Sequence, residues 1–227
     1  MKTLLLRLSA PLQSWGSDSK FETRRTQPYP TKSGTVGMLA AALGISREDD
    51  ASLKKLSSLR FGIRIDKEGE LLRDYHTVMG EKPYITNRYY LADAYFLVGL
   101  ESEDECFLQK LEAALRAPVY PLYLGRRSCP PSLPLVRSIC DKELCQALEE
   151  EPWLLPEWRQ KRSFSKAERE LRIIIEDNDS ENTVRDVPLS FSKKRRAFGW
   201  RGIREYKYIT AEIHEHSTEH DPFTELR

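Results

Sequence analysis

The sequence predicts an α+β fold built from alternating strands and amphipathic helices, and three observations support this prediction. Apolar residues alternate over 2–9 and again over 61–65, which indicates strands. Apolar residues recur at helical spacing over 107–115, directly behind the capping box Ser102–Glu105. The 227 residues, 40% hydrophobic and 31% charged, have a globular composition and can bury a core without a metal or disulfide staple.

The first 125 residues give a regular order of elements. We expect a strand with one buried face, a helix ended by Gly44, three strands, a second helix and a last strand. These are placed at 2–9, 35–43, 61–65, 70–78, 89–100, 107–115 and 119–124. The order is β-α-β-β-β-α-β, and merging or extending one hairpin gives the ferredoxin-like plan β-α-β-β-α-β.

The pattern loosens beyond residue 125. Prolines at 130, 131 and 134 predict an extended loop, and a short helix is expected over 141–150. Segments 171–176 and 182–189 have the pattern of a hairpin, and a final strand is expected over 203–214. We therefore expect a first domain over 1–125 and a smaller, β-rich and basic region over 126–227 that packs on it.

Charge is balanced overall but unevenly distributed. Lysine and arginine total 36 against 35 acids, so the net charge of +1 gives no reason to expect a nucleic acid partner. However, the segment from Lys193 to Lys207 carries seven basic residues against the single acid Glu205. Such asymmetry produces a basic surface on a neutral protein, and a solvated charged face is an equally good explanation.

No feature of the sequence predicts a membrane span, a metal site or a cofactor. No apolar run reaches the ~18 residues that a transmembrane helix needs. Met1 leads directly into a strand without a signal peptide, so the expected compartment is the cytoplasm. The four cysteines form no C-x-x-C pair and are expected to be reduced. The three histidines near the C-terminus lie among acids, as in an exposed tail.

The long loop before the first helix combines cations with aromatic rings. Arg24, Arg25 and Lys32 share it with Trp15, a combination that suits single-stranded RNA, because phosphates meet cations and bases stack on rings. Ser33 lies at the start of the helix, where backbone N–H groups form a phosphate site. An ordinary helix cap explains the same residues, and both interpretations stay open.

Two further segments could carry chemistry. Arg126 and Arg127 occupy a loop stiffened by prolines, which suits a phosphate clamp or a solvent-facing pair. Alternation along the preceding strand predicts that their side chains diverge, so at most one faces RNA. His76, with Tyr75 and Lys82, could act in a metal-independent ribonuclease. With no second acid–base candidate in view, we favour a contact or hydrogen-bonding role for His76.

Six short motifs occur in a fixed order, spread from residue 1 to about 205. They are Ala10–Gly16, Tyr29–Gly34, Arg73–Val78, Tyr90–Ala94, Tyr123–Pro130 and Arg185–Leu189. Each motif alone is modestly specific, but six in the same order are highly specific. Together they resemble the CasD family, a subunit of the type I-E Cascade complexes of CRISPR systems.

The resemblance implies a ferredoxin-like, RRM-like RNA-binding fold with a β-hairpin thumb, which we place near 76–90. It implies a non-catalytic subunit, one copy per complex, that holds the 5′ handle of the CRISPR RNA and caps the filament of backbone subunits. The implied partners are the backbone subunit, the large subunit and other Cascade proteins, with target DNA met only through the complex. A relative in another subtype processes RNA, which keeps a His76-based endoribonuclease as the alternative.

The residues that we expect to bind RNA are the cations, rings and polar groups of these segments. They are Gln13, Trp15, Arg24, Arg25, Lys32, Ser33, His76, Arg88, Tyr89, Arg126, Arg127, Ser128, Lys193, Lys194, Arg195 and Arg196. Tyr90 is a further candidate for stacking. No catalytic residue is expected. A third hypothesis is a protein-only scaffold whose arginines face acidic partners.

Overall fold

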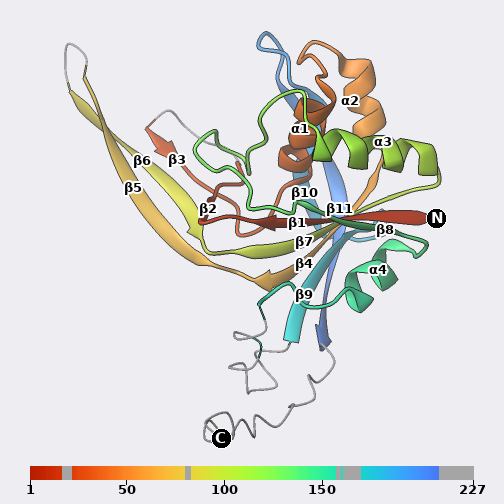
Figure 1. The fold of residues 1–227 in the computed structure, drawn as a ribbon. Helices are drawn as coiled ribbons and strands as arrows, with labels where there is room; N and C mark the ends of the chain where they lie inside the picture. The colour runs from red at the N-terminus through yellow and green to blue at the C-terminus, as the bar shows by residue number, and fades with distance from the viewer. Residues whose placement is uncertain (17–21, 80–82, 157–159, 161–169, 210–227) are drawn as a thin grey trace, which may run out of the picture.

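The computed structural model describes residues 1–16, 22–79, 83–156, 160 and 170–209. Within them, one large sheet has helices on both faces, and a second, smaller sheet leaves it as a long curved hairpin (Figure 1). This confirms the α+β prediction. Among the described residues, no helix is long and apolar enough to cross a membrane.

The large sheet has seven strands in the order β10-β11-β9-β4-β7-β1-β8, and every neighbouring pair is antiparallel. Four of its strands are β4 (Arg60–Lys67), β7 (Tyr95–Ser102), β1 (Lys2–Ser9) and, at one edge, β8 (Val136–Cys140). We expected β1 to have one buried face, but both are buried. Leu4, Leu6 and Leu8 face the main core, whereas Leu5 faces a second core on the other side of the sheet.

Three helices cover the main core and a fourth covers the second core (Figure 1). They are α1 (Lys32–Leu43), α2 (Asp50–Ser57), α3 (Glu105–Arg116) and, on the opposite face, α4 (Leu144–Glu150). Gly44 ends α1 with φ 72°, in the left-handed region that favours glycine. The sequence did not predict α2, because it is short and buries only Leu53 and Leu56.

The smaller sheet contains part of a segment that we expected to be one continuous strand. In place of a single strand over 89–100, β6 (Tyr84–Ala92) and β7 are separated at Asp93, whose φ is 53°. The break lets β6 leave the large sheet and pair with β5 (Glu70–Val78). The short strands β2 (Leu12–Gln13) and β3 (Thr23–Arg24) also pair with β6, close to where the hairpin leaves the body. The hairpin therefore begins and ends outside the expected limits of 76–90.

The expected strand over 119–124 is absent, and β8 takes its place beside β1. The backbone N–H groups of Val119 and Tyr120 instead donate to the oxygens of Ala42 and Ala41, at 3.0 and 3.2 Å. These are carbonyls of the last turn of α1, which have no partner inside the helix. The segment therefore covers the end of α1 and does not join the sheet.

The C-terminal strands exist, but their pairing differs from the prediction. They are β9 (Glu170–Glu176), β10 (Thr183–Ser190) and β11 (Ala197–Ile209). The first two do not form a hairpin, because β11 lies between them and pairs with both. The final strand begins at residue 197, earlier than the expected 203, and the part of the prediction from residue 210 onward lies outside the described residues.

Candidate nucleic-acid interface

The segment Ala10–Gly16 joins the hairpin to the body. The N–H of Ser14 donates to the oxygen of Leu124 at 3.1 Å, and its hydroxyl donates to the oxygen of Tyr89 at 3.2 Å. The N–H of Trp15 donates to Thr26 Oγ1 at 2.8 Å. One short motif thus ties together the hairpin, the loop after Leu124 and the loop that carries β3. We call this region the thumb base.

Two residues expected to bind RNA support the thumb base from inside. Gln13 and Trp15 both have 0% of their surface exposed. Gln13 Nε2 donates to the oxygen of Ala94 at 2.8 Å, and Trp15 Nε1 donates to Gln13 Oε1 at 3.2 Å. The Trp15 ring packs so closely on α1 that a Cβ at Gly34 would lie 2.9 Å from it. Their buried side chains present no surface for stacking and hold the fold together.

Arg126 also bonds inside the chain. Its Nη2 donates to the oxygen of Arg24 at 2.7 Å and lies 3.4 Å from the oxygen of Arg25. Its guanidinium stacks over the ring of Tyr90, 4.7 Å from the centroid. Arg127, by contrast, is exposed and no described residue pairs with it. The two arginines thus have different surroundings, and the strand from which we predicted that their side chains diverge is absent.

Arg24, Arg88 and Asp74 are in register across β3, β6 and β5. Arg88 Nε and Arg126 Nη1 are both buried without a hydrogen-bond partner among the described residues. A buried donor without an acceptor is costly, more so when it is charged. The thumb base therefore contains two guanidinium groups, each with one buried donor that has no acceptor among the described residues.

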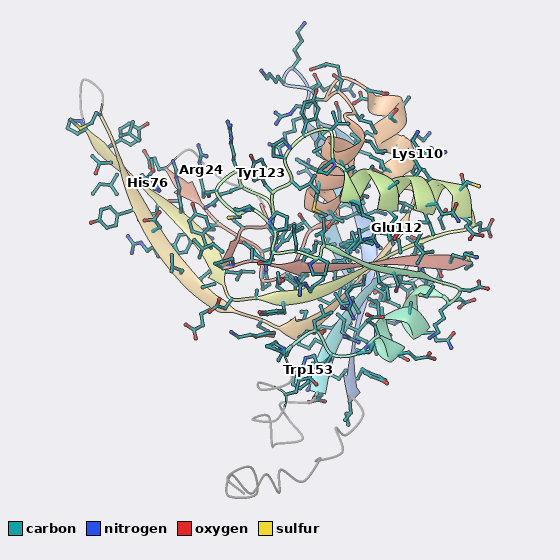
Figure 2. The ribbon with its side chains drawn as sticks, viewed as in Figure 1. Arg24, His76, Lys110, Glu112, Tyr123 and Trp153 are labelled. Carbon is teal, nitrogen blue, oxygen red and sulfur yellow. The ribbon has the colours of Figure 1, made fainter. Side chains whose placement is uncertain are left out.

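His76 lies on the outer part of the hairpin, away from α3 (Figure 2). Its Nε2 is 2.8 Å from Asp74 Oδ2, and both side chains are 44% exposed. Lys82 and the other three histidines lie outside the described residues. The described surroundings of His76 supply a carboxylate that orients its ring, and no second general acid.

The remaining candidates at the thumb base are open to solvent to different degrees. Arg24, Arg25 and Ser128 are exposed, and Tyr89 is half-buried. Figure 2 shows Arg24 between the hairpin and Tyr123, which lies on the loop that leads to Arg126. The structure thus brings together five cations from three separate segments of the sequence: Arg24, Arg25, Arg88, Arg126 and Arg127.

The start of α1 is already occupied by carboxylates of this chain. The backbone N–H of Lys32 donates to Asp186 Oδ2 at 2.8 Å, and its Nζ lies 2.7 Å from Glu176 Oε2. Burial lowers the pKa of Lys32, which is only 3% exposed, below its usual value. Ser33 is half-buried, with its hydroxyl 3.4 Å from Thr31 Oγ1. The cap interpretation of this motif therefore describes the structure.

The basic run Lys193–Arg196 lies apart from the thumb base, at the turn between β10 and β11 beside α2 (Figure 1). All four side chains are exposed. Sequence reasoning grouped the run with the other cations, but it did not single out the neighbouring Trp200, which is 67% exposed on β11. An exposed tryptophan inside a basic segment was the signal that could have identified it.

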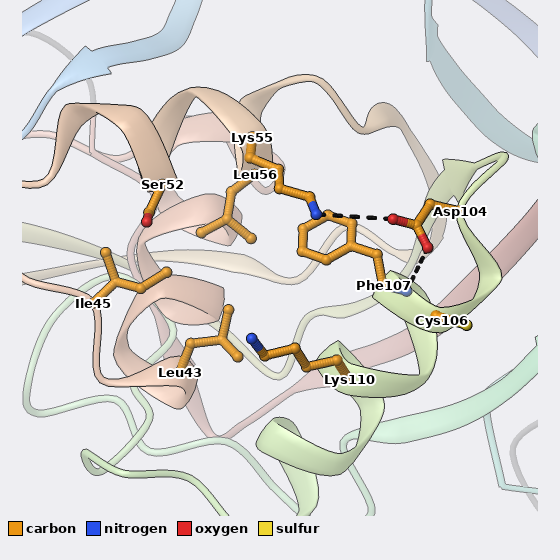
Figure 3. Close-up of a pocket in the computed structure, with 9 residues that line it drawn as sticks. All are labelled: Leu43, Ile45, Ser52, Lys55, Leu56, Asp104, Cys106, Phe107 and Lys110. Atoms are coloured by element: carbon orange, nitrogen blue, oxygen red, sulfur yellow. Dashed lines mark hydrogen bonds and ion pairs between the residues drawn. The ribbon is translucent and has the colours of Figure 1, made fainter.

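One pocket lies on the helical side of the molecule, away from the thumb base. It has a volume of about 290 Å³ and lies between the end of α1, α2 and the start of α3 (Figure 3). The ammonium of Lys55 sits over the Phe107 ring at 4.4 Å and 3.8 Å from Asp104 Oδ2. Within the described parts of the chain, no group of His, Cys, Asp and Glu is arranged to hold a metal ion.

Comparison with known proteins adds the family. A family model described as CRISPR-associated protein (Cas_Cas5) matches residues 3–204. The CRISPR system Cascade subunit CasD of Escherichia coli (strain K12) is 40% identical over 158 residues, which cover 60% of this chain and 70% of that protein.

Two solved structures resemble the chain along most of its length. A chain described as a Cas protein is 42% identical, with a TM-score of 0.71 over 92% of this chain and 95% of that one. A chain of a CRISPR RNA-guided surveillance complex is 31% identical, with a TM-score of 0.74 over 92% and 90%. The resemblance of the six motifs to CasD is thereby confirmed, and the chain belongs to the Cas5 family of CRISPR-associated proteins.

Proposed function

We propose that this chain is a non-catalytic RNA-binding subunit of a type I-E CRISPR surveillance complex, in which it holds the 5′ handle of the CRISPR RNA. One observation carries the proposal: the chain matches a component of a CRISPR RNA-guided surveillance complex over 92% of its length at 31% identity. The relative from Escherichia coli is likewise a Cascade subunit. The cytoplasm remains the expected compartment.

The RNA backbone runs over the thumb base in this proposal. Arg24, Arg25 and Arg127 are exposed cations that can reach phosphates. Arg88 and Arg126 contribute guanidinium N–H groups that have no partner among the described residues. Ser128, His76 and Tyr89 border this surface and contact the RNA at its edge. Gln13, Trp15, Lys32, Ser33 and Tyr90 act indirectly, by fixing the positions of the cations.

The hairpin is the proposed thumb, and its exposed side meets a neighbouring backbone subunit. The hairpin exposes large apolar side chains that a soluble hairpin has no reason to present to water: Leu71, Tyr75, Tyr84 and Ile85 on its strands, and Met79 directly after β5. The chain caps the filament of backbone subunits in this arrangement. It contacts the large subunit through another face and meets target DNA only within the complex.

We propose that the first part of the chain is a ferredoxin-like unit. The support is the strand order β8-β1-β7-β4 with α1 and α3 on one face, which is the order that a β-α-β-β-α-β unit adopts. The division into 1–125 and 126–227 stays a prediction about folding units. Strands from both sides of residue 125 belong to the same sheet, so the two parts share one framework.

A His76-based endoribonuclease is not favoured. General acid–base cleavage needs a base for the 2′-hydroxyl and an acid for the leaving oxygen. His76 is paired with Asp74 on an exposed strand and has no second acid–base partner among the described residues.

Co-expression with the neighbouring CRISPR genes tests the proposed function. We expect a defined small RNA and several proteins to co-purify with the chain, and complexes assembled without the chain to lose the RNA's 5′ end to added nuclease. A complex that protects the same RNA equally well without the chain would show that it does not hold the handle.

A further inference from the structure

The hairpin of β10 and β11 presents a surface that the thumb base does not explain. Trp200 is 67% exposed and Leu189 is 57% exposed, on adjacent strands. Phe198 lies two residues before Trp200, so both rings share one face of β11. We call Phe198, Trp200 and the run Lys193–Arg196 the hairpin surface.

The charge of this surface is one-sided. Residues 187–204 contain six lysines and arginines and no aspartate or glutamate. Arg201 is paired with Asp186, and Arg204 is paired with Asp177. The four cations of the run are exposed and form no ion pair with any described residue. A polyanion is therefore the partner that complements the turn.

The turn is also ordered before any partner binds. The N–H of Ser192 donates to Ser190 Oγ, and the N–H of Lys194 donates to Ser192 Oγ, both at 3.2 Å. Phe191 packs on α1 close to Gly37, and Ser57 of α2 donates its hydroxyl to the oxygen of Pro188 at 3.1 Å. Because these contacts hold the backbone, binding has to order only the side chains of the cations.

The rings fit an unpaired base better than they fit a protein groove. Arg201, on the opposite face of β11, is buried over Phe61 at 5.1 Å, so that face belongs to the core. On the exposed face, the guanidinium of Arg196 lies over the Phe198 ring at 5.2 Å, and Trp200 follows Phe198 on the same face of the strand. Exposed rings interleaved with cations are the arrangement that binds single strands, whose bases stack while their phosphates meet the charges.

We propose that the hairpin surface is a second nucleic-acid contact, separate from the thumb base. Trp200 stacks on an unpaired base, and the run Lys193–Arg196 holds the flanking phosphates. This inference extends the proposed function and rests on it. The chain thus binds two separate segments of nucleic acid, one at the thumb base and one at the hairpin surface.

Anisotropy titrations of the full chain test the inference with three labelled 20-mers: oligo-U RNA, oligo-dT DNA and a duplex DNA. We expect Trp200→Ala to weaken single-strand binding roughly tenfold, because stacking is lost. Trp200→Phe keeps a stacking ring and should stay within about threefold of the parent. The RNA and DNA arms identify which strand the surface prefers.

Three outcomes would overturn the inference: parent-like single-strand binding by Trp200→Ala, a loss confined to the duplex, or a lowered melting temperature, which would make the ring structural. Arg127→Ala separates this inference from the proposed function. If only the thumb base is real, Arg127→Ala loses RNA affinity and Trp200→Ala does not. If the handle proposal is wrong but the hairpin surface is real, the two results are reversed.

Discussion

Arg126 Nη2 lies 2.7 Å from the backbone oxygen of Arg24, a residue 102 positions earlier in the chain. The same guanidinium stacks over Tyr90 of the hairpin. One side chain therefore joins the loop after Leu124, the segment with β3 and the thumb. Arg126 positions the neighbouring cations, and its Nη1 is buried without an acceptor among the described residues.

Arg126→Ala and Arg127→Ala should differ in RNA affinity by at least about tenfold. Arg127→Ala removes one charge-assisted contact, ~1.5–3 kcal/mol, or about one to two decades in affinity. Arg126→Ala should cost more, because it also frees the Arg24–Arg25 segment. Handle-RNA titrations and thermal melts provide the measurement, with Arg116→Ala on α3 as the control. Parent-like binding by both variants would show that this loop does not contact the handle.

The purified chain should not cleave CRISPR repeat RNA. The physical reason is the absence of a second acid–base group beside His76 in the described structure. Labelled repeat RNA is incubated with the chain and with His76→Ala, each with and without EDTA. Products that form with the parent and disappear with His76→Ala would establish the endoribonuclease alternative.

Replacing Lys193, Lys194, Arg195 and Arg196 together by alanine should weaken RNA binding regardless of sequence. Each lost phosphate contact lowers the slope of log affinity against log salt by roughly 0.7 on single strands. A matched control removes four exposed cations from the helical side, namely Arg47, Lys54, Lys110 and Arg116. Equal slopes in the parent and the 193–196 variant would assign the run to solvent or to a protein partner.

Asp186→Asn should lower the melting temperature by roughly 10 °C. Asp186 accepts from Arg201 Nε at 2.6 Å, from Arg201 Nη2 at 3.0 Å and from the N–H of Lys32. Removing one partner of a buried ion pair costs about 3–5 kcal/mol, and each kcal/mol corresponds to about 2–4 °C in a chain of this size. Arg185→Ala, on the exposed side of the same strand, should melt like the parent. Matching melts for Asp186→Asn would show that this ion pair contributes little.

Buried cysteines should react with an alkylating reagent more slowly than exposed ones. Burial raises the pKa of the Cys129 thiol, and that of Cys140, above the usual value. A raised pKa means less thiolate at a given pH, so both should require higher pH to react than in the unfolded chain. Cys106 is exposed and should react first with iodoacetamide. Peptide mass spectrometry over a pH series measures the order, and guanidinium-unfolded protein is the control. Equal rates for Cys129 and Cys106 in the folded chain would contradict the buried site.

Local signals in the sequence predicted several elements well. The alternation of leucines gave β1, Gly44 marked the end of α1, and the apolar spacing gave α3, although Asp104 rather than Ser102 caps it. These features depend on residues within a few positions of one another. The six motifs likewise identified the family, since each is a short run of neighbouring residues.

The tertiary structure decided which strands pair and which side chains are free. Nothing local indicates that Asp93 separates two sheets, or that β11 lies between β9 and β10, because pairing is set by distant partners. The same holds for charge. Lys32 and Arg127 are both cations in candidate RNA-binding segments. The fold pairs Lys32 with Glu176, 144 positions away, whereas Arg127 is exposed and pairs with no described residue. A cation's role depends on whether folding brings a carboxylate to it, and only the folded chain determines that.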